Sequence, residues 1–266
     1  MSNKIFQENA KVIYTREIAY NMFETMLYSP KISQHIKAGQ FINILPSNNW
    51  NNIMRRPMSV ASQETNNISI IYKVVGQGTQ IMKNWKVNDM INILGPLGNF
   101  WEGYENNIPI LIGGGVGVAP IINLKNHLDD LNIEHIMIMG AKIRNEHFLN
   151  HDPDKGIYLS TDNGSTGISG TVIDVLNTIN YNVNNKIFAC GPPAMMEAVK
   201  AFSIEKEIDC DLAIETIMAC GFGICQGCTV EIVNIEKNKN SYRQKYALAC
   251  IDGPIFKAKD IKTCYL

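Results

Sequence analysis

The spacing of apolar residues divides the chain into segments of different character. Up to about residue 103, apolar residues recur at alternate positions in short segments separated by Gly, Pro, Asn and Ser. This pattern predicts antiparallel strands in a small barrel or sandwich, with one helical interruption at 78–85. The predicted strand segments are AKVIYTREI, YNMFETMLYS, QFINILPS, RPMSVAS, NISIIYKVV and DMINILGP.

From residue 104 to residue 208, buried apolar runs alternate with amphipathic segments. The runs IPILIG, EHIMIMGA, GIYLS and NKIFACG predict strands. The segments APIINLKNHLDDL, SGTVIDVLNTI and PAMMEAVKAF predict helices between them. Such alternation is typical of βαβ units, so we expect a parallel sheet with helices on its faces.

The third region, residues 209–266, is distinguished by cysteine, because it holds six of the seven cysteines of the chain. A unit this small buries little apolar surface, so we expect a metal or cluster to stabilise it. The sequence therefore predicts a multidomain α/β plus β protein. Its domains are an antiparallel β-barrel at 1–103, an α/β domain at 104–208 and a small cysteine-rich cluster domain at 209–266.

Composition excludes several classes of partner. The 266 residues carry a formal net charge of −1, which gives no electrostatic reason to expect nucleic acid or an anionic membrane. The longest uncharged apolar stretch, 108–124, is shorter than the roughly 20 residues of a membrane span. The N-terminal residues lack an apolar segment typical of a secretion signal, so we expect a cytoplasmic protein. Clustered cysteines in that compartment favour ligands or redox groups over disulfides.

The strongest chemical signal is the spacing Cys220-x4-Cys225-x2-Cys228, followed at a distance by Cys250. This is the ligand spacing of plant-type 2Fe–2S clusters. Glycines between the first three cysteines would let backbone N–H groups approach the sulfur atoms. The alternatives are a structural zinc site with four cysteine ligands and a thioredoxin-like dithiol. Cys210 and Cys264 fall outside the spacing, and we expect plain thiols there.

Three further motifs suit phosphate-containing ligands. The glycine-rich run 113–117 joins a predicted strand to a helix, where backbone N–H groups can bind a pyrophosphate or where glycine can serve packing alone. Cys190, Gly191 and Pro192 follow another predicted strand, at the sheet edge where open α/β sheets bind ligands. The segment 55–59, RRPMS, suits a phosphate or ribityl group, although two arginines beside a proline, taken alone, are more often a solvated surface turn.

In this order, RRPMSVAS, GGGVGVAP, CGPPAMM and the cysteine loop resemble the ferredoxin–NADP reductase superfamily. Further segments narrow the resemblance to the electron-transfer subunits of class 1B dihydroorotate dehydrogenase, over nearly the whole chain. They are REIA, GQF, IYKVVGQGT, LGPLGNF, TDNGSTGISGTVIDVL, MACGFGICQGC and ACIDGPIF.

The resemblance assigns roles to individual positions and identifies no catalytic acid, base or nucleophile. It implies FAD at Arg56, Pro57, Met58, Ser59, Ile71, Tyr72, Lys73, Gly78 and Thr79, with the last two at the pyrophosphate. It implies NAD(H), as substrate, at Gly113, Gly114, Gly115, Gly117, Cys190, Gly191 and Pro192. It implies a 2Fe–2S cluster on Cys220, Cys225, Cys228 and Cys250.

The function implied by the resemblance is electron transfer between NAD and a partner chain in pyrimidine biosynthesis. The partner would be an FMN-containing dihydroorotate dehydrogenase subunit that oxidises dihydroorotate to orotate, in a heterotetramer with two copies of each chain. One alternative is an electron-transfer subunit of another flavoprotein complex, such as NADH-dependent ferredoxin:NADP oxidoreductase, sulfide dehydrogenase or hydrogenase. Another is a redox-sensing or zinc-stabilised interaction protein with degenerate nucleotide motifs.

Overall fold

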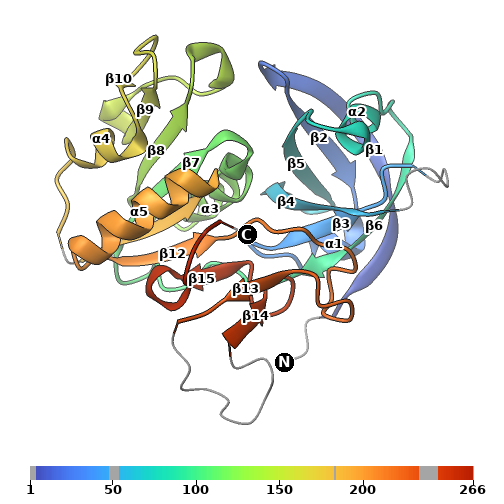
Figure 1. Ribbon diagram of the computed structural model, residues 1–266. Helices are drawn as coiled ribbons and strands as arrows, with labels where there is room; N and C mark the ends of the chain where they lie inside the picture. Colours follow the sequence, from blue (N-terminus) through green and yellow to red (C-terminus); the bar gives the residue numbers. More distant parts are fainter. Residues whose placement is uncertain (1–3, 48–53, 183, 234–244, 266) are drawn as a thin grey trace.

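The computed structural model describes residues 4–47, 54–182, 184–233 and 245–265. A barrel and an α/β unit lie side by side, and the C-terminal segment lies beneath both (Figure 1). Within the described ranges, no helix is long and apolar enough to cross a membrane.

Six antiparallel strands close the N-terminal barrel in the order β1-β2-β5-β4-β3-β6. They are β1 (Phe6–Ala19), β2 (Met22–Tyr28), β3 (Phe41–Ile44), β4 (Arg56–Gln63), β5 (Asn67–Lys73) and β6 (Met90–Leu97). Alternate residues such as Val12, Ile42, Ile70 and Ile93 are fully buried inside, as the two-residue periodicity predicts. Two short helices accompany the barrel: α1 (Pro30–Ser33) and α2 (Gln77–Met82), which is shorter than the helix expected at 78–85.

The second unit is a seven-stranded sheet in the order β10-β9-β8-β7-β11-β12-β15. Its strands are β7 (Ile108–Gly114), β8 (Ile136–Ala141), β9 (Ile157–Thr161), β10 (Ile168–Ser169), β11 (Asn185–Cys190), β12 (Asp209–Ala213) and β15 (Ile255–Lys257). Its helices are α3 (Val118–Asp130), α4 (Val172–Leu176) and α5 (Pro193–Glu205), with 3-10 turns η2 (Gly115–Gly117), η3 (Arg144–Glu146), η4 (Pro153–Lys155) and η6 (Ala258–Asp260).

Helices cover both faces of this sheet. Ile110 and Ile112 on β7 belong to the same apolar cluster as the buried residues of α4 and α5. Leu111, between them, belongs to the cluster that includes the buried face of α3. Successive strand residues therefore bury into opposite layers, which is why the predicted strands are continuously apolar.

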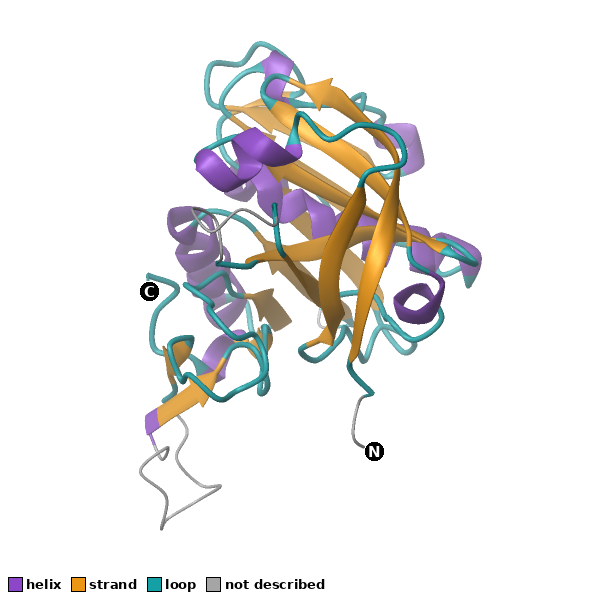
Figure 2. Cartoon of the chain, turned by 90° about the vertical axis from the view of Figure 1, so that its right-hand side faces the viewer, coloured by secondary structure: helices purple, strands orange, loops and turns teal. Residues whose placement is uncertain are grey.

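The C-terminal segment forms a small hairpin and then returns to the large sheet. The hairpin pairs β13 (Thr229–Glu231) with β14 (Tyr246–Leu248) and lies at the lower edge of the molecule in both views (Figures 1 and 2). β15 then pairs antiparallel with β12, which itself pairs in parallel with β11. Because β12 belongs to the sheet, the predicted domain boundary at 208/209 falls between two paired strands. The domain boundary at 208/209 remains a prediction.

Candidate functional site

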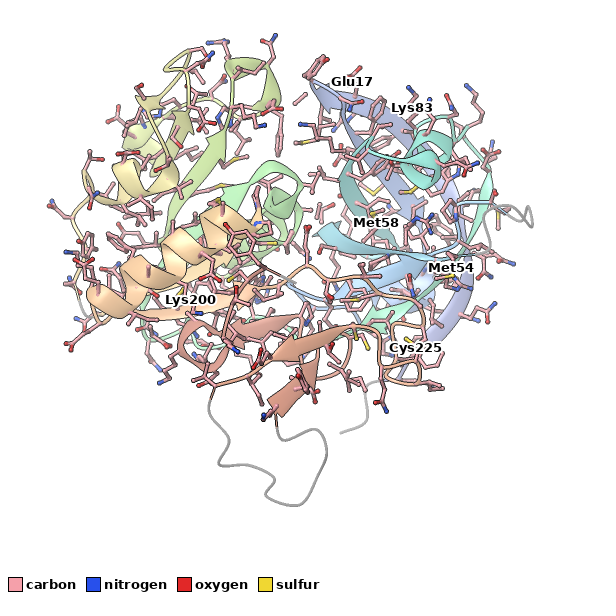
Figure 3. All side chains as sticks on the ribbon, in the orientation of Figure 1. Glu17, Met54, Met58, Lys83, Lys200 and Cys225 are labelled. Atoms are coloured by element: carbon pink, nitrogen blue, oxygen red, sulfur yellow. The ribbon has the colours of Figure 1, made fainter. Side chains whose placement is uncertain are left out.

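A cavity of about 240 Å³ lies where the barrel, the α/β sheet and the C-terminal segment meet. Seven of its lining residues are ones that the sequence predicts for a flavin: Pro57, Met58, Ser59, Ile71, Tyr72, Lys73 and Thr79. The opposite wall includes Val116 and Ala119, followed by Ile214, Glu215, Thr216 and Met218. Met58 lies at the edge of the barrel that faces the α/β unit (Figure 3).

Strand pairing brings the barrel side of this cavity together. Val60 on β4 pairs with Ile70 on β5, so the segments 57–59 and 71–73 run side by side toward the cavity. Tyr72 is anchored by a 3.2 Å hydrogen bond between its hydroxyl group and that of Thr25. Burial raises the pKa of Tyr72 to about 12, so its phenol stays neutral at physiological pH.

The two predicted arginines have different surroundings. Arg55 is held by the barrel, since its Nη1 donates to the Asn43 and Asn92 carbonyls at 3.0 and 3.3 Å. Arg56 lies against the start of α2, where a Cβ built on Gly78 would come within 2.9 Å of its Nε. The missing side chain at Gly78 therefore leaves room for the guanidinium beside the first N–H groups of α2. This cradle fits a phosphate-containing cofactor such as FAD.

The glycine-rich turn and the Cys190–Pro192 turn form one edge of the sheet. Gly113 pairs with Cys190 on the adjacent parallel strand. A Cβ at Gly117 would lie 2.5 Å from the Cys190 carbonyl, and one at Gly114 would lie 2.5 Å from the sulfur atom of Met195. Gly117 is therefore required for packing, because its neighbour is backbone, whereas the Met195 side chain at Gly114 can move aside. Gly115, with φ of 56° and no atom closer than 3.9 Å to a Cβ there, is the open position of the turn.

Cys190 is a buried thiol at this junction. Burial raises its pKa well above the ordinary value, and the carboxylate of Glu215 adds to the effect. Cys190 therefore stays protonated at neutral pH. The contact of nucleotide with Cys190, Gly191 and Pro192 remains a prediction.

Glu215 is a cavity residue that the sequence analysis did not identify. It follows β12 and lines the cavity wall opposite the barrel. Although its side chain can be reached from the cavity, the surrounding protein desolvates the carboxylate and raises its pKa. The available sequence signal was an acidic residue immediately after an apolar strand, at the edge where such sheets bind ligands.

A second cleft, of about 740 Å³, lies between the tip of the β1–β2 hairpin and the segment that follows β8. Its lining includes Glu17, Tyr20, Arg144 and His147, and none of the site residues predicted from the sequence. Glu17 lies at the end of the hairpin nearest the α/β unit (Figure 3). The cleft adjoins the carboxyl end of β8, so it lies at the sheet edge that binds ligands in open α/β folds.

The cysteine loop follows the cavity wall directly. Met218 lines the cavity, and Cys220 begins the loop two residues later. Asn43 of the barrel fastens this segment, because its Nδ2 donates to the carbonyls of Ala219 and Cys220 at 3.1 and 3.2 Å. Gly221 has a φ of 82°, a left-handed conformation that lets the loop turn back on itself.

Within the loop, backbone N–H groups point at sulfur. The Cys225 N–H donates to Cys220 Sγ at 3.4 Å. Burial opposes ionisation of Cys220, but hydrogen bonds from backbone N–H groups, including those of Cys225 and Phe222, outweigh it and lower the Cys220 pKa to about 7. The Sγ atoms of Cys228 and Cys250 lie 3.1 Å apart. Burial, and to a smaller extent the neighbouring Cys228 thiol, raises the pKa of Cys250 to about 12.

This donor set fits an iron–sulfur cluster, whose sulfur atoms accept hydrogen bonds from backbone N–H groups. In the described part of the chain, no group of three or more His, Cys, Asp or Glu side chains is arranged to hold a metal ion. The assignment of Cys220, Cys225, Cys228 and Cys250 as cluster ligands therefore remains a prediction. It is supported by the spacing, the thiol contact and the N–H groups of the loop.

The class of iron–sulfur flavoprotein reductases is defined by three features found together here. They are a barrel with this cavity, a parallel sheet with a glycine-rich edge, and a cysteine loop. Two family models match the chain: "Oxidoreductase FAD-binding domain" at residues 10–101 and "Iron-sulfur cluster binding domain of dihydroorotate dehydrogenase B" at residues 215–262. The expected cofactors, FAD and an iron–sulfur cluster, are confirmed by these matches.

The similarity extends over nearly the full chain. The electron transfer subunit of dihydroorotate dehydrogenase B (NAD(+)) from Fusobacterium nucleatum is 31% identical, over 96% of this chain and 98% of that protein. The subunit of the same name from Streptococcus mutans is 32% identical, over 97% and 98%. The chain belongs to the family of dihydroorotate dehydrogenase B electron transfer subunits.

Solved structures show the same fold. The structure of an NADH-dependent reduced ferredoxin-NADP oxidoreductase superposes with a TM-score of 0.82 at 24% identity, over 99% of this chain and 92% of that one. The ferredoxin reductase of carbazole 1,9a-dioxygenase gives a TM-score of 0.67 at 18% identity, over 78% and 68%. The predicted fold class, a β-barrel with an α/β domain and a C-terminal cluster domain, is confirmed.

Proposed function

We propose that this chain passes electrons between an FMN-containing dihydroorotate dehydrogenase subunit and NAD, coupling oxidation of dihydroorotate to orotate with NAD reduction in pyrimidine biosynthesis. The observation that carries the proposal is the match of residues 215–262 to the iron–sulfur cluster binding domain of dihydroorotate dehydrogenase B. Near full-length relatives bearing that subunit's name support it. The alternative, a subunit of another flavoprotein complex, is supported only by fold similarity at 24% identity.

The chain's own residues would hold and separate the cofactors. The walls of the 240 Å³ cavity come from three parts of the chain, so a flavin bound there would contact the barrel, the α/β unit and the C-terminal segment. The segment 214–218 serves both sites, because it lines the cavity and leads directly to Cys220. When bound, FAD supplies two-electron exchange with the nucleotide and the cluster supplies one-electron transfer to the partner.

The proposed nucleotide site is the sheet edge formed by residues 113–117 and 190–192. Close packing of these two turns fixes their backbone N–H groups at the carboxyl ends of β7 and β11. We propose NAD(H) as the nucleotide, a cytoplasmic location, and a heterotetramer containing two copies of this chain and two of its partner.

The test is reconstitution with a purified FMN-containing dihydroorotate dehydrogenase chain. Alone, this protein should oxidise NADH with an artificial acceptor and should not turn over dihydroorotate. The mixture should couple dihydroorotate oxidation to NAD reduction, and the Cys225→Ser chain should lose that coupling while NADH oxidation by a direct flavin acceptor largely survives. Normal coupling with the Cys225→Ser chain would contradict the proposed relay.

A further inference from the structure

The turn η3, which follows β8 in the α/β unit, contacts the barrel at two points. The backbone N–H of Tyr20, in the turn between β1 and β2, donates to the Asn145 carbonyl at 2.8 Å. Lys73, the last residue of β5, forms an ion pair with Glu146, with 2.7 Å between Nζ and Oε1. A single short turn of the nucleotide unit is thus fastened to the barrel through both backbone and side chain.

Glu146 is held in place from its own side as well. Its second oxygen, Oε2, accepts the Lys142 N–H at 3.1 Å. Its side chain is only 17% exposed, against 31% for Lys73. The hydrogen bond from Lys73 holds the pKa of the Glu146 carboxyl below its usual value, against the opposing effect of burial. The carboxylate is therefore ionised at neutral pH and prepositioned for the ammonium group.

Lys73 is also part of the cavity wall. Among the described lining residues of that cavity, Lys73 and Glu215 are the two with side chains that carry charge. Glu215 lies on the opposite wall, where its side chain is exposed but desolvation by the surrounding protein raises its pKa. The electrostatic potential in the cavity therefore depends on the ammonium group of Lys73 and on the Glu146 carboxylate that offsets its charge.

We propose that Glu146 is a positioning residue that sets the reduction potential of the bound flavin through Lys73. Reduction places negative charge on a flavin, which a nearby cation stabilises, and a carboxylate 2.7 Å from that cation offsets the effect. Because Glu146 belongs to the turn at the carboxyl end of β8, the potential is tied to the placement of the nucleotide unit. The inference rests on the proposed function in one respect, that FAD occupies this cavity.

The experiment compares the oxidised-to-reduced ratio of FAD bound to the full chain, against a redox dye of known potential. Glu146→Gln keeps the shape of the side chain and removes its charge. We expect the ratio at fixed potential to shift about tenfold toward reduced flavin, equivalent to about 30 mV for a two-electron couple. Lys73→Met should shift it in the opposite direction, and Lys73→Arg, which keeps the cation, should leave it within about twofold of the wild type.

The double variant separates action through Lys73 from a structural effect. In the Lys73→Met background, Glu146→Gln should change the ratio less than twofold. Glu24→Gln is the matched control, because Glu24 forms an ion pair of 2.6 Å with Arg16 on the same barrel and neither residue lines the cavity. It should cause no shift.

Two results would overturn the inference. One is an unchanged ratio in either the Glu146→Gln or the Lys73→Met chain. The other is an equal shift from Glu146→Gln with and without Lys73. Failure of the proposed function would be seen differently, as wild-type protein that binds no FAD or does not couple to the dihydroorotate dehydrogenase chain.

Discussion

The thiols of Cys228 and Cys250 lie 3.1 Å apart although the two residues are 22 positions apart in the chain. The hairpin explains the contact, because β13 starts immediately after Cys228 and Thr229 pairs with Leu248 on β14. Pairing at the base of the hairpin fixes the distance between the two thiols, whatever the length of chain beyond it. The long interval between the third and fourth cysteines is therefore compatible with one ligand set.

Substitution of any one of Cys220, Cys225, Cys228 and Cys250 by Ser should remove or greatly weaken the paramagnetic signal of the reduced cluster. The reason is that a 2Fe–2S cluster of this type requires four thiolates. FAD content should be retained, because the cavity lies outside the loop. Electron paramagnetic resonance and flavin absorbance on the same samples measure both.

Cys264→Ser is the control for cysteine replacement, since Cys264 is buried outside the loop at 3% exposure. Its cluster signal should equal that of the wild type. A normal signal in Cys250→Ser together with a lost signal in Cys264→Ser would contradict the ligand assignment.

Arg56→Ala should lower FAD occupancy several-fold with little change in thermal stability, because its guanidinium lies in the cradle at Gly78. Arg55→Ala should lower thermal stability and leave FAD occupancy nearly unchanged. It breaks charged hydrogen bonds to the Asn43 and Asn92 carbonyls, which we expect to cost about 2 kcal/mol of unfolding free energy. Flavin absorbance per chain and thermal unfolding separate the two effects. Equal FAD content in both variants would show that Arg56 has no special role.

Gly117→Ala should destabilise the protein by about 1–3 kcal/mol, the usual cost of overpacking. The backbone at Gly117 has a φ of −61°, which alanine adopts freely, so the cost comes from the 2.5 Å approach to the Cys190 carbonyl. Gly76→Ala is the matched control, since a Cβ there meets nothing within 4 Å. Thermal unfolding of the two variants checks the prediction, and similar losses in both would contradict it.

His147 should make the protein less stable as the pH falls below about 6.5. Burial lowers its pKa, despite the opposing effects of the Ser160 carbonyl and Glu146. The folded state thus favours the neutral imidazole ring. The contribution of His147 to the free energy of unfolding is therefore fully present above the pKa of the ring in the unfolded chain, and is lost as the pH falls through its pKa in the folded protein. Between pH 7.5 and 5.5, the melting temperature should fall about 2 °C more in wild type than in His147→Gln. Identical profiles of melting temperature against pH in wild type and His147→Gln would contradict this role of His147.

Local patterns predicted most of the fold because each strand and helix carries its own signal. The alternation in RPMSVAS and NISIIYKVV predicted β4 and β5, and with them the cavity wall from Pro57 to Lys73. β15 was not predicted. It is three residues long, and its place in the sheet depends on pairing Leu212 with Phe256, a contact between distant parts of the chain.

The site shows the same division between local and distant information. Cysteine spacing and the glycine-rich turn are local, so they could be recognised. The sequence could not show that Gly117 is needed for packing against Cys190, because that contact joins the turn η2 to the distant strand β11. The Lys73–Glu146 ion pair, the cavity position of Glu215 and the 740 Å³ cleft also arise only when separate units meet.

The antiparallel strand β15 has a consequence for the order of folding during synthesis. All six barrel strands lie within the first 97 residues, so the barrel can close while the rest of the chain is still being translated. In the sheet, in contrast, β12 has a partner on one side only, β11, until residue 257 has left the ribosome and β15 can pair with it. An open edge can pair with other chains. Completion of the sheet and closure of the cysteine loop at Cys250 therefore fall in the same late step, after the barrel has formed.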